Sequence, residues 1–528
     1  LTSGQSTSQS TVTYGTPSGP IHSTAANGIV DGMNTGSGQW RSIYLTYSAH
    51  YAYKGRYVAD FSLRRDGTTK FGADKRWGTF PALSVRWNVS REPWFNKALP
   101  WVSMLSIRPG WGIVGKQPGS EYLYFSKYAI GKGYLSQGSI YPQNIRMKNL
   151  KWEQKETYNI GADFGFFDDK ISGNVEVYRQ YTSDLLMQNR GIPTSSGYPH
   201  LLWQNVGNME NIGWEFNLNG NSIVKAGKFG MDFNVTFANN RNRVTAMDET
   251  CLASLNNEFN RNNGSYLSRV ELNYALGSIY GFRYLGVYQY SDYSAEEVPG
   301  VSGPNAPVVR DKDGIVILDE NQMTKPMMFC AGSVNYEFRG GDAIYDDINH
   351  DGTIDELDIV YLGSSLPKVT GGWGFKLRWG RLSWNNQFNF RYGNKIINRV
   401  RMNAENMYSN NNQSRAVNWR WRVEGDDARI PRALRQHGYN WLGSDRFVED
   451  GSFMRLNYSQ ISYSCPANEL KRFGLNRLDF YVSANNLFCL TNYSGSDPEV
   501  GYGGLGIVTD NAQTPRAKSF TAGVTIGF

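Results

Sequence analysis

SFTAGVTIGF, residues 519–528, alternates strictly between apolar side chains and small or polar ones. A β-strand here would carry Phe520, Val524 and Ile526 on one face, because successive side chains of a strand point to opposite sides. An apolar face that ends on an aromatic ring would be left in water at the edge of a soluble sheet. The same face fits a strand that meets lipid, with its terminal ring at the membrane interface.

The same period of two recurs along the chain and predicts several hairpins. Residues 42–53 and 57–64 alternate on either side of the turn Lys54-Gly55. Residues 158–166 and 171–177 do so around Asp168-Asp169, and residues 373–379 and 382–390 around Gly380-Arg381. Further alternating segments are 83–89, 214–218, 231–237 and 478–484. Together they predict an all-β protein with about fourteen strands.

Composition agrees with a membrane-spanning sheet. The chain has 528 residues, 57 Gly, 33 Tyr and 15 Trp, and 14% of its residues are aromatic. No run of 18 or more apolar residues occurs, so a transmembrane helix is excluded. Alternating strands average to a polar composition, and aromatic girdles mark the two interfaces of an outer-membrane barrel.

Charge and motif content exclude several other functions. The 54 basic and 47 acidic residues are spread along the chain, with no basic stripe, so we expect no nucleic-acid partner. The four cysteines form no CxxC pair and the five histidines are scattered, which argues against a zinc site. No nucleophile elbow or HExxH motif is present, and GYGGLG (501–506) lacks the Lys-Ser/Thr of a phosphate-binding loop. His50 on a polar strand face is expected to line a pore. We therefore expect no enzyme, no catalytic residue and no organic cofactor.

Strand and loop lengths favour a barrel over a large secreted β-protein, which remains the soluble alternative. The strands reach roughly ten residues or more, as tilted spans of a bilayer require. Some connections are tight, whereas residues 116–155, 240–275 and 393–450 form long loops rich in Asn, Gly, Ser and Tyr. Short turns on one side and long extracellular loops on the other are typical of outer-membrane barrels. Residues 1–40 are predicted to be a polar loop, also extracellular.

The polar strand faces are expected to line the lumen. Their predicted cations, Arg56, Arg64, Arg86, Lys376 and Arg378, would face Asp60 and Glu176 or an internal plug. Four loop tryptophans, Trp203, Trp419, Trp421 and Trp441, are equally suited to stack on sugars, to anchor a lid or to pack the loops. The sequence identifies no substrate-contacting residue.

One stretch has the spacing of a calcium loop: DINHDGTIDELD, residues 347–358. The predicted ligands are Asp347, Asn349, Asp351, the Thr353 carbonyl, Asp355 and Asp358, and Gly352 would allow the sharp turn. Asp358 is shorter than the usual glutamate at its position, and IVYLG after it reads as a strand rather than a helix. The alternative is an Asx-rich turn that binds no ion. A bound Ca²⁺ would stiffen the loop rather than catalyse a reaction.

Several segments, in order along the chain, resemble the C-terminal portion of SusC-like TonB-dependent outer-membrane transporters. They are RRDGTTKFGADKRWGTFPALSVRW (64–87), LKWEQKETYNIGADFGFFDDKISGNVEVYRQYTSDLLM (150–187), GDAIYDDINHDGTIDELDIVYLGSSLPKVTGGW (341–373), NNLFCLTNYSGSDPEV (485–500) and the terminal Phe528. The resemblance covers the chain from about residue 40 onward, so residues 41–528 would be the C-terminal part of such a barrel.

The resemblance implies a location in the outer membrane of a Gram-negative bacterium and a barrel of about 22 strands around a plug. This chain would supply the later strands, about fourteen of them. It further implies TonB as the energy-coupling partner, a SusD-like surface lipoprotein as a lid, and oligosaccharides or peptides as cargo. No plug and no TonB-binding segment is recognisable in this chain, so those parts and the remaining strands would come from elsewhere. The alternative function is a porin or adhesin barrel without energy coupling.

Overall fold

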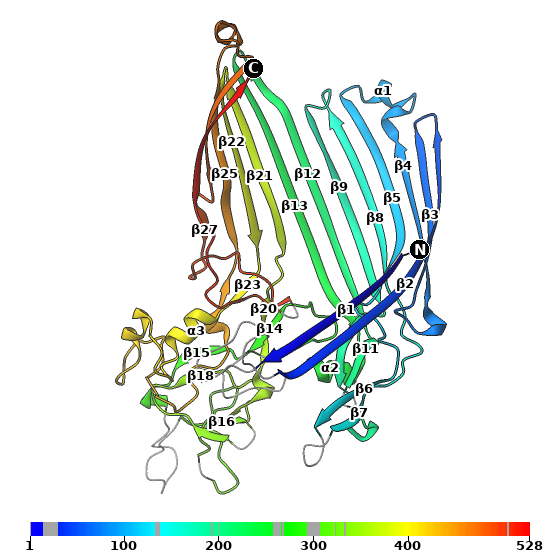
Figure 1. Ribbon diagram of the computed structural model, residues 1–528. Coiled ribbons are helices and arrows are strands. Elements are labelled where there is room, and N and C mark those ends of the chain that lie inside the picture. The colour runs from blue at the N-terminus through cyan, green and yellow to red at the C-terminus, as the bar shows by residue number, and fades with distance from the viewer. Residues whose placement is uncertain are drawn as a thin grey trace.

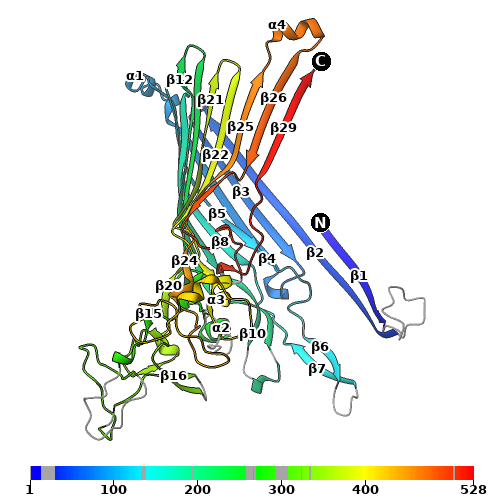
Figure 2. The ribbon, with the colours of Figure 1, turned by 90° about the vertical axis from the view of Figure 1, so that its left-hand side faces the viewer.

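The computed structural model describes residues 2–13, 30–132, 138–191, 194–198, 200–256, 266, 269–292, 307–322, 324–331, 334–503 and 506–528. Its dominant element is one curved antiparallel sheet of long strands (Figure 1). Within the described residues this sheet has 15 strands, and β1 and β29 lie at the two ends of the strand order. Figure 2 shows it from the side as an open curved wall.

The strands of this main sheet follow one another in chain order. They are β1 (Thr2–Thr13), β2 (Val30–Tyr53), β3 (Tyr57–Thr68), β4 (Trp77–Asn88), β5 (Val102–Lys116), β8 (Glu153–Phe166), β9 (Ile171–Ser183), β12 (Asn208–Ala226), β13 (Phe229–Ala246), β21 (Val369–Trp379), β22 (Leu382–Tyr392), β25 (Phe453–Ser464), β26 (Arg477–Asn485) and β29 (Ser519–Gly527), with β27 (Cys489–Thr491) beside β25. The predicted alternating segments fall within these strands, except that Val89 lies one residue beyond β4 and Phe528 one residue beyond β29.

Strand register places the apolar residues of neighbouring strands side by side. Val235 of β13 lies opposite Trp373 of β21, which lies opposite Phe388 of β22. The rings of Trp373 and Phe388 stack with centroids 4.0 Å apart. Many large apolar side chains of this face are exposed, among them Tyr47 (65%) and Trp379 (72%). A soluble sheet of this size would cover such a face, so the register gives the molecule a lipid-facing surface.

One interruption of the ladder has a clear local cause. Ser84 of β4 pairs with Gly110 of β5, and the next pair is Trp87 with Ile107. Pro109 lies in the gap, and proline has no N–H to donate. The strands resume pairing beyond it, so the wall stays continuous.

The two ends of the sheet differ in their connections (Figure 1). At one end the connections are short; β2 and β3 are joined through Lys54 and Gly55, both with positive φ as a tight hairpin turn requires, and β21 and β22 through Gly380. The short helices α1 (Phe95–Ala98) and α4 (Ala467–Leu470) lie at this end. At the other end are the long connections 117–152, 184–207, 247–368, 393–452 and 486–518, which we call the loop layer.

The loop layer contains its own short strands and two helices. They are β6 (Lys127–Lys132), β7 (Gly138–Asn144), β10 (Leu186–Gly191), β11 (His200–Asn205), α2 (Glu249–Leu255), β14 (Ser278–Gly281), β15 (Tyr284–Val287), β16 (Met328–Ala331), β17 (Val334–Glu337), β18 (Ala343–Tyr345), β19 (Thr353–Ile354), β20 (Val360–Ser364), β23 (Lys395–Asn398), α3 (Arg399–Glu405), β24 (Val448–Asp450) and β28 (Thr509–Asp510). Strand β23 pairs with both β24 and β28, which ties two of the long connections together.

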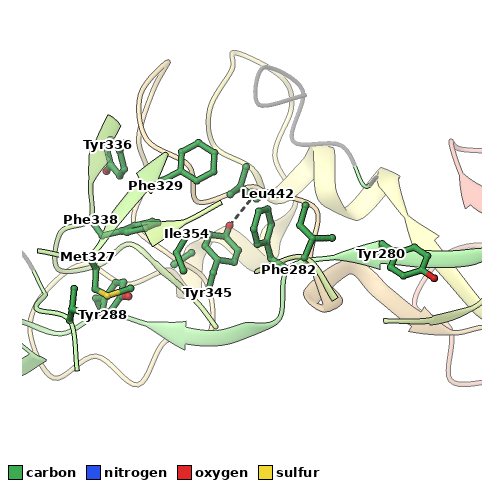
Figure 3. Packing of buried hydrophobic residues seen from close by; sticks show 13 residues of the cluster. Tyr280, Phe282, Tyr288, Met327, Phe329, Tyr336, Phe338, Tyr345, Ile354 and Leu442 are labelled. Atoms are coloured by element: carbon green, nitrogen blue, oxygen red, sulfur yellow. Dashed lines mark hydrogen bonds between the residues drawn. The ribbon is translucent and has the colours of Figure 1, made fainter. Parts of the chain in front are cut away.

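The largest buried apolar cluster lies in the loop layer and not in the sheet (Figure 3). It is built from Tyr280, Phe282, Tyr288, Val309, Met327, Phe329, Tyr336, Phe338, Ala343, Tyr345, Ile354, Ile359 and Leu442. Phe282, Phe329, Phe338 and Leu442 have no exposed surface. Most of these residues belong to 247–368, and Leu442 is contributed by 393–452. The long loops therefore pack as a folded layer.

The prediction that residues 1–40 form a polar loop is wrong for much of that range. Thr2–Thr13 form β1, and β2 already begins at Val30. The two strands pair in antiparallel fashion from Thr2 with Ser42 to Thr13 with Val30. Residues 14–29 of the predicted loop lie outside the described residues. Neither Thr2–Thr13 nor the first part of β2, residues 30–41, alternates apolar with polar residues, so the sequence pattern did not predict a strand there.

Candidate functional site

The face of the sheet opposite the apolar one is polar and extensively hydrogen-bonded. Asp163 of β8 accepts two bonds of 2.8 Å from the Arg108 guanidinium, one of 3.0 Å from Arg86 and one of 2.9 Å from the Ser106 hydroxyl. Arg378 of β21 donates to Asp232 of β13 at 2.8 Å. Each of these bonds crosses between strands, so the polar face is a rigid wall.

Most of the predicted lumenal charges have local partners, and Lys376 lies opposite Asp232 in the register of β21 and β13. Of the predicted cations, Arg86 and Arg378 pair with Asp163 and Asp232 rather than with Asp60 or Glu176. The other partners are His50 Nδ1 to Asp60 Oδ1 at 2.6 Å, Asn159 to Glu176 at 2.9 Å, Arg64 to Asp66 at 2.7 Å and Arg56 to Glu92 at 3.5 Å. The sequence placed the charges on the right face, but it did not give the cross-strand partner because register is not visible in it.

A hollow of about 560 Å³ lies on this polar wall, across β2 to β8. Its lining includes the small residues Ser48, Ser62, Ser84, Gly110 and Gly112, together with His50 and Asp60. The shortness of these side chains creates the hollow. Within the described residues, no serine or cysteine side chain hydrogen-bonds to His50, so the hollow lacks an activated nucleophile.

A second hollow, of about 650 Å³, lies near the loop layer, where β13 is no longer paired with β21. The last pair between β13 and β21 is Ala238 with Thr370. Farther along, Val244 bonds instead to the backbone of Asn273 and Tyr274, at 2.7 and 3.0 Å. Residues 239–242 lie between these points and line the hollow, so side chains of both sheet faces reach it. We call it the rim hollow.

The lining of the rim hollow combines amides with aromatic rings. Asn239, Asn240 and Asn242 contribute from β13, and Tyr274 and Tyr361 from the loop layer. The two tyrosine rings lie 5.6 Å apart, and both are exposed. Amide groups that donate and accept, next to an aromatic face, suit a polar ligand such as a sugar or a peptide backbone. The sequence offered no signal for this site, because three separate segments form it.

Asp342 joins two long loops at a buried polar node. Its carboxylate has no exposed surface. It accepts from the Arg432 guanidinium at 2.7 and 3.1 Å, from the Tyr336 hydroxyl at 2.7 Å and from the Asn440 amide at 3.1 Å. Asn440 in turn accepts from the Ala343 N–H at 2.8 Å. A buried carboxylate with this many donors fixes the two loops relative to each other.

A second node links residues 393–452 to residues 486–518. Arg401 of α3 donates to Glu405 at 3.0 Å and to Glu449 of β24 at 3.1 Å. Glu449 also accepts from the Ser494 N–H and hydroxyl, both at 2.8 Å. Burial acts to raise the pKa of Glu449, but the bonds from Ser494 and Arg401 outweigh it and hold the pKa below its usual value.

The predicted loop tryptophans divide between packing and exposure. Trp421 and Trp441 are buried, and the Trp421 indole N–H donates to Gln289 at 2.9 Å. Trp203 is half-buried and packs against the cluster around Phe71 and Trp152. Trp419 is 63% exposed. The Arg415 guanidinium lies 5.8 Å from the centroid of its ring, and the rest of the indole is open to a ligand.

The predicted calcium loop, residues 347–358, forms a tight turn in which the acidic side chains accept from backbone amides. Asp347 accepts from the N–H groups of Asp351 and Gly352 at 3.2 and 2.7 Å. Asp351 accepts from the Thr353 N–H at 2.7 Å, and Asn349 from the Asp351 N–H at 3.1 Å. These bonds are those of an Asx-rich turn, with Gly352 at φ 81°.

Asp358 closes this turn from its far end. Its carboxylate is fully buried and accepts from the N–H groups of Ile348 and Asp355 at 2.8 and 2.9 Å. Burial, with the nearby charges of Asp347 and Asp355, raises the pKa of Asp358 to about 6. Among the described residues, no group of three or more Asp, Glu, His or Cys side chains is arranged to hold a metal. The donor set suits a hard cation, but its oxygens would have to turn inward from the amides they contact.

Comparison with known proteins defines the family. Residues 2–319 match the family described as TonB dependent receptor-like, beta-barrel. The chain belongs to this family. It is 29% identical over 493 residues to TonB-dependent receptor P39 of Formosa agariphila and 28% identical over 500 residues to TonB-dependent receptor SusC of Bacteroides thetaiotaomicron. These alignments cover 90% and 91% of this chain but 45% and 43% of the relatives, so the chain spans about half of their length.

Solved structures support the same fold. The structure of the RagAB peptide transporter superposes with a TM-score of 0.72 at 21% identity, covering 94% of this chain and 48% of that one. The predicted fold class and the resemblance to SusC-like receptors are thus confirmed. As a member of the TonB-dependent receptor family, the chain is an outer-membrane β-barrel protein of a Gram-negative bacterium, and its family is one of receptors and transporters rather than enzymes. Within the described residues, no helix has the length and apolarity to cross a bilayer.

Proposed function

We propose that this TonB-dependent receptor chain forms much of the wall and the extracellular loop layer of a nutrient importer for oligosaccharides or peptides. In this proposal TonB energises transport through a segment of the whole protein that also supplies the plug and the remaining strands. A SusD-like surface lipoprotein covers the loop layer. We propose no catalytic role for the chain, in keeping with a family of receptors and transporters.

The observation that carries the proposal is the register of the main sheet. It separates an apolar face from a hydrogen-bonded polar face over every paired strand from β2 to β29. The sheet has two open edges, β1 and β29, in the described part of the chain. Open edges are not stable in lipid, because each backbone donor and acceptor there needs a partner. Strands from the rest of the whole protein would provide those partners.

The folded loop layer supports a lidded importer. In outer-membrane barrels the long connections are extracellular. Here two of them, 247–368 and 393–452, enclose the largest apolar cluster of the described residues and are joined by the ion pair of Asp342 and Arg432. A porin that only admits small solutes does not need so large a packed layer, whereas a surface that docks a lipoprotein and receives cargo does. The rim hollow lies below this layer and offers a polar, aromatic-lined contact for the cargo.

The polypeptide composition of the native complex tests this proposal against the porin or adhesin alternative. We would extract the complex from outer membranes in mild detergent and determine the intact mass of every chain. We expect a plug-bearing segment and a surface lipoprotein to co-purify with this sequence. A lone chain of this sequence forming a closed, stable barrel would contradict the importer and leave the porin or adhesin.

We further propose that the turn at residues 347–358 binds Ca²⁺. Each carboxylate oxygen of Asp347 accepts one backbone bond, and those of Asp351 accept one bond from the Thr353 N–H and one from the Asn349 side-chain amide, the latter at 3.0 Å. Each of these oxygens therefore keeps a lone pair for a cation. Asp358 and Asp347 repel one another across the turn, and a divalent ion would relieve this repulsion. The ion would hold β19 against β16 and so stiffen the loop layer.

Calcium titration of the detergent-solubilised protein, followed by calorimetry, tests this second proposal. Asp351→Asn should weaken binding by about tenfold or more, because site charge sets affinity. Asp311→Asn is the matched control: Asp311 accepts from the N–H groups of Asp313 and Ile315, both at 2.9 Å, in a similar Asx turn without the calcium-loop spacing. Equal heats with and without the Asp351 change would show that the turn binds no ion.

A further inference from the structure

Three arginines lie together on the apolar side of the sheet, at its loop-layer end. Register places Arg179 of β9 opposite Ile212 of β12, and Ile212 opposite Arg241 of β13. In the next row toward the loop layer, Tyr181 lies opposite Glu210, and Glu210 opposite Arg243. Because directly paired residues of antiparallel strands share a face, all three guanidinium groups belong to the lipid-facing side. We call Arg179, Arg241 and Arg243 the rim arginines.

The rim arginines begin where the apolar surface ends. Two residues before Arg179 on the same face of β9 is Val177, which is 48% exposed. On the same face of β12, the exposed apolar residues Trp214 and Ile212 are followed toward the loop layer by the buried carboxylate Glu210. On β13 the outward positions change from Val235 and Phe237, through Asn239, to Arg241 and Arg243. A change from apolar and aromatic to cationic side chains is expected where hydrocarbon gives way to headgroups. The loop-layer end is extracellular, so these headgroups are those of the outer leaflet.

The charge of this site is only partly balanced by the protein. Glu210 is buried, and its carboxylate accepts from Arg179 Nε at 2.5 Å and from Arg243. The side chains of Arg179 and Arg243 nevertheless remain 63% and 41% exposed. Arg241 is exposed and has no ion-pair partner among the described residues. Glu156 lies on the same face opposite Tyr181, so three cations and two carboxylates leave one net positive charge at the headgroup level.

An aromatic belt continues this site along the neighbouring strands. Tyr158 lies opposite Arg179 in the same row, and Trp111 lies opposite Tyr158. The Tyr158 hydroxyl and the Trp111 indole N–H both donate to Glu156, at 2.6 and 2.8 Å. Amphipathic rings with their polar ends turned toward the loop layer fix this row at the interface.

We propose that the rim arginines bind the phosphate groups of a phosphorylated outer-leaflet glycolipid. A planar guanidinium matches phosphate with two parallel N–H donors, and binding improves when the charge is partly desolvated beside apolar surface. Glu210 holds Arg179 and Arg243 in place, and Arg241 completes the site from the third strand. Bound lipid would anchor this side of the wall next to the rim hollow, where β13 lacks its β21 neighbour.

A purely structural role for the cluster would be to neutralise Glu210. Arg179 and Arg243 suffice for that, and Arg241 makes no contact with the carboxylate. Arg241 also lines the rim hollow, whereas Arg179 does not. Separate substitutions of Arg179 and Arg241 therefore distinguish a lipid site on the outer face from a ligand site in the hollow.

Native mass spectrometry of the intact complex, isolated from outer membranes and stripped of lipid, tests the proposal. The probes are bisphosphorylated lipid A, its dephosphorylated form and inorganic phosphate. We expect retention of the bisphosphorylated lipid alone. Arg179→Gln and Arg241→Gln should each weaken it by about fivefold, the effect of one cation near a charged membrane surface. Arg283→Gln is the matched control, since Arg283 is half exposed in the loop layer and pairs with a single carboxylate, Asp346.

Glu210→Gln separates binding from folding. This change removes the internal anion, so it should lower thermal stability but leave lipid retention equal or stronger. The proposal is overturned if both lipid forms bind equally, if inorganic phosphate competes at the same concentration as the lipid, or if Arg179→Gln has no effect. An effect of Arg241→Gln alone would likewise overturn it and assign the ligand to the rim hollow.

Discussion

Asp342 illustrates how single residues hold the extracellular part of this receptor together. It is a fully buried carboxylate that receives bonds from Arg432, Tyr336 and Asn440, and the first and last of these lie about ninety residues away in another loop. Removing one partner of such a pair leaves an uncompensated buried charge, which costs far more than the pair contributes when intact. The packing of two loops therefore depends on one side chain.

We expect Asp342→Asn to destabilise the loop layer by about 3–5 kcal/mol, because Arg432 would keep its charge without its partner. Hydrogen exchange of residues 334–345 and 430–445 measures the effect as lost protection. Asp346→Asn is the control. Its pair with Arg283 is partly exposed, so its loss should cost less than about 1 kcal/mol. Equal effects of the two changes would mean that the node does not hold the loops.

The stability of the loop layer depends on pH through Glu449. Its pKa in the folded protein lies below its usual value, so its ionised form contributes stability that is complete at neutral pH. This contribution is lost as the pH falls through the lowered pKa of the folded carboxylate, below the usual range of a glutamate. Amide protection in residues 448–450 and 491–496, corrected for intrinsic exchange, should fall between pH 6 and pH 3.5. Glu449→Gln should weaken protection at pH 6 and abolish most of the change; an unaltered pH profile in this variant would contradict the assignment.

At the scale of elements, the main sheet is a wall with two chemically different faces. Adjacent residues of β13 show the contrast: Val235 lies between apolar neighbours, and Thr236 lies on the polar face. Register alone decides which residue meets lipid and which meets the lumen.

We therefore expect Val235→Lys and Thr236→Lys to differ sharply although they are neighbours in sequence. A lysine near the middle of the lipid-facing surface costs about 2–4 kcal/mol, whereas lumenal positions tolerate charge. The amount of folded whole protein in the outer membrane, measured by heat-modifiable gel mobility, reports the difference. Similar assembly of both variants would show that the two faces are misassigned.

Alternation in the sequence predicted most strands from β2 to β29, because lipid and lumen favour it along each span. No alternating segment was predicted in β5 or β25. Elements that lack this constraint were not predicted from the sequence. Thr2–Thr13 has no apolar face, and the short strands of the loop layer, such as β16 and β19, pair only after distant loops fold around a common core. Arg241 and Arg243 continue the outward-facing positions of Phe237 along β13. They lie beyond the predicted segment 231–237, because charged side chains break the apolar pattern that marks the strand. The sequence carried no signal for the Asp342 node or for the rim hollow, because the residues that form each of them come from separate segments.

At the scale of the whole molecule, the two ends of the wall have different roles. Short turns end the strands on one side, and the loop layer covers the other. In an outer-membrane receptor the first side is periplasmic and the second faces the environment.

Labelling of intact cells with a membrane-impermeant thiol reagent tests this orientation in a background that lacks the native cysteines. We expect labelling of Asp313→Cys in the loop layer and none of Lys228→Cys in the turn between β12 and β13. Cell lysis should make both variants reactive. The reverse pattern on intact cells would invert the topology.

The central claim is that this chain forms the wall of an energised importer. Accumulation of labelled oligosaccharides and peptides by cells that produce the whole protein, with TonB present or depleted, tests it most directly. The account predicts that one of these cargo classes enters only when TonB is present and that its uptake falls in the Asp342→Asn variant. Uptake of small solutes at equal rates with and without TonB would contradict it and identify a passive pore.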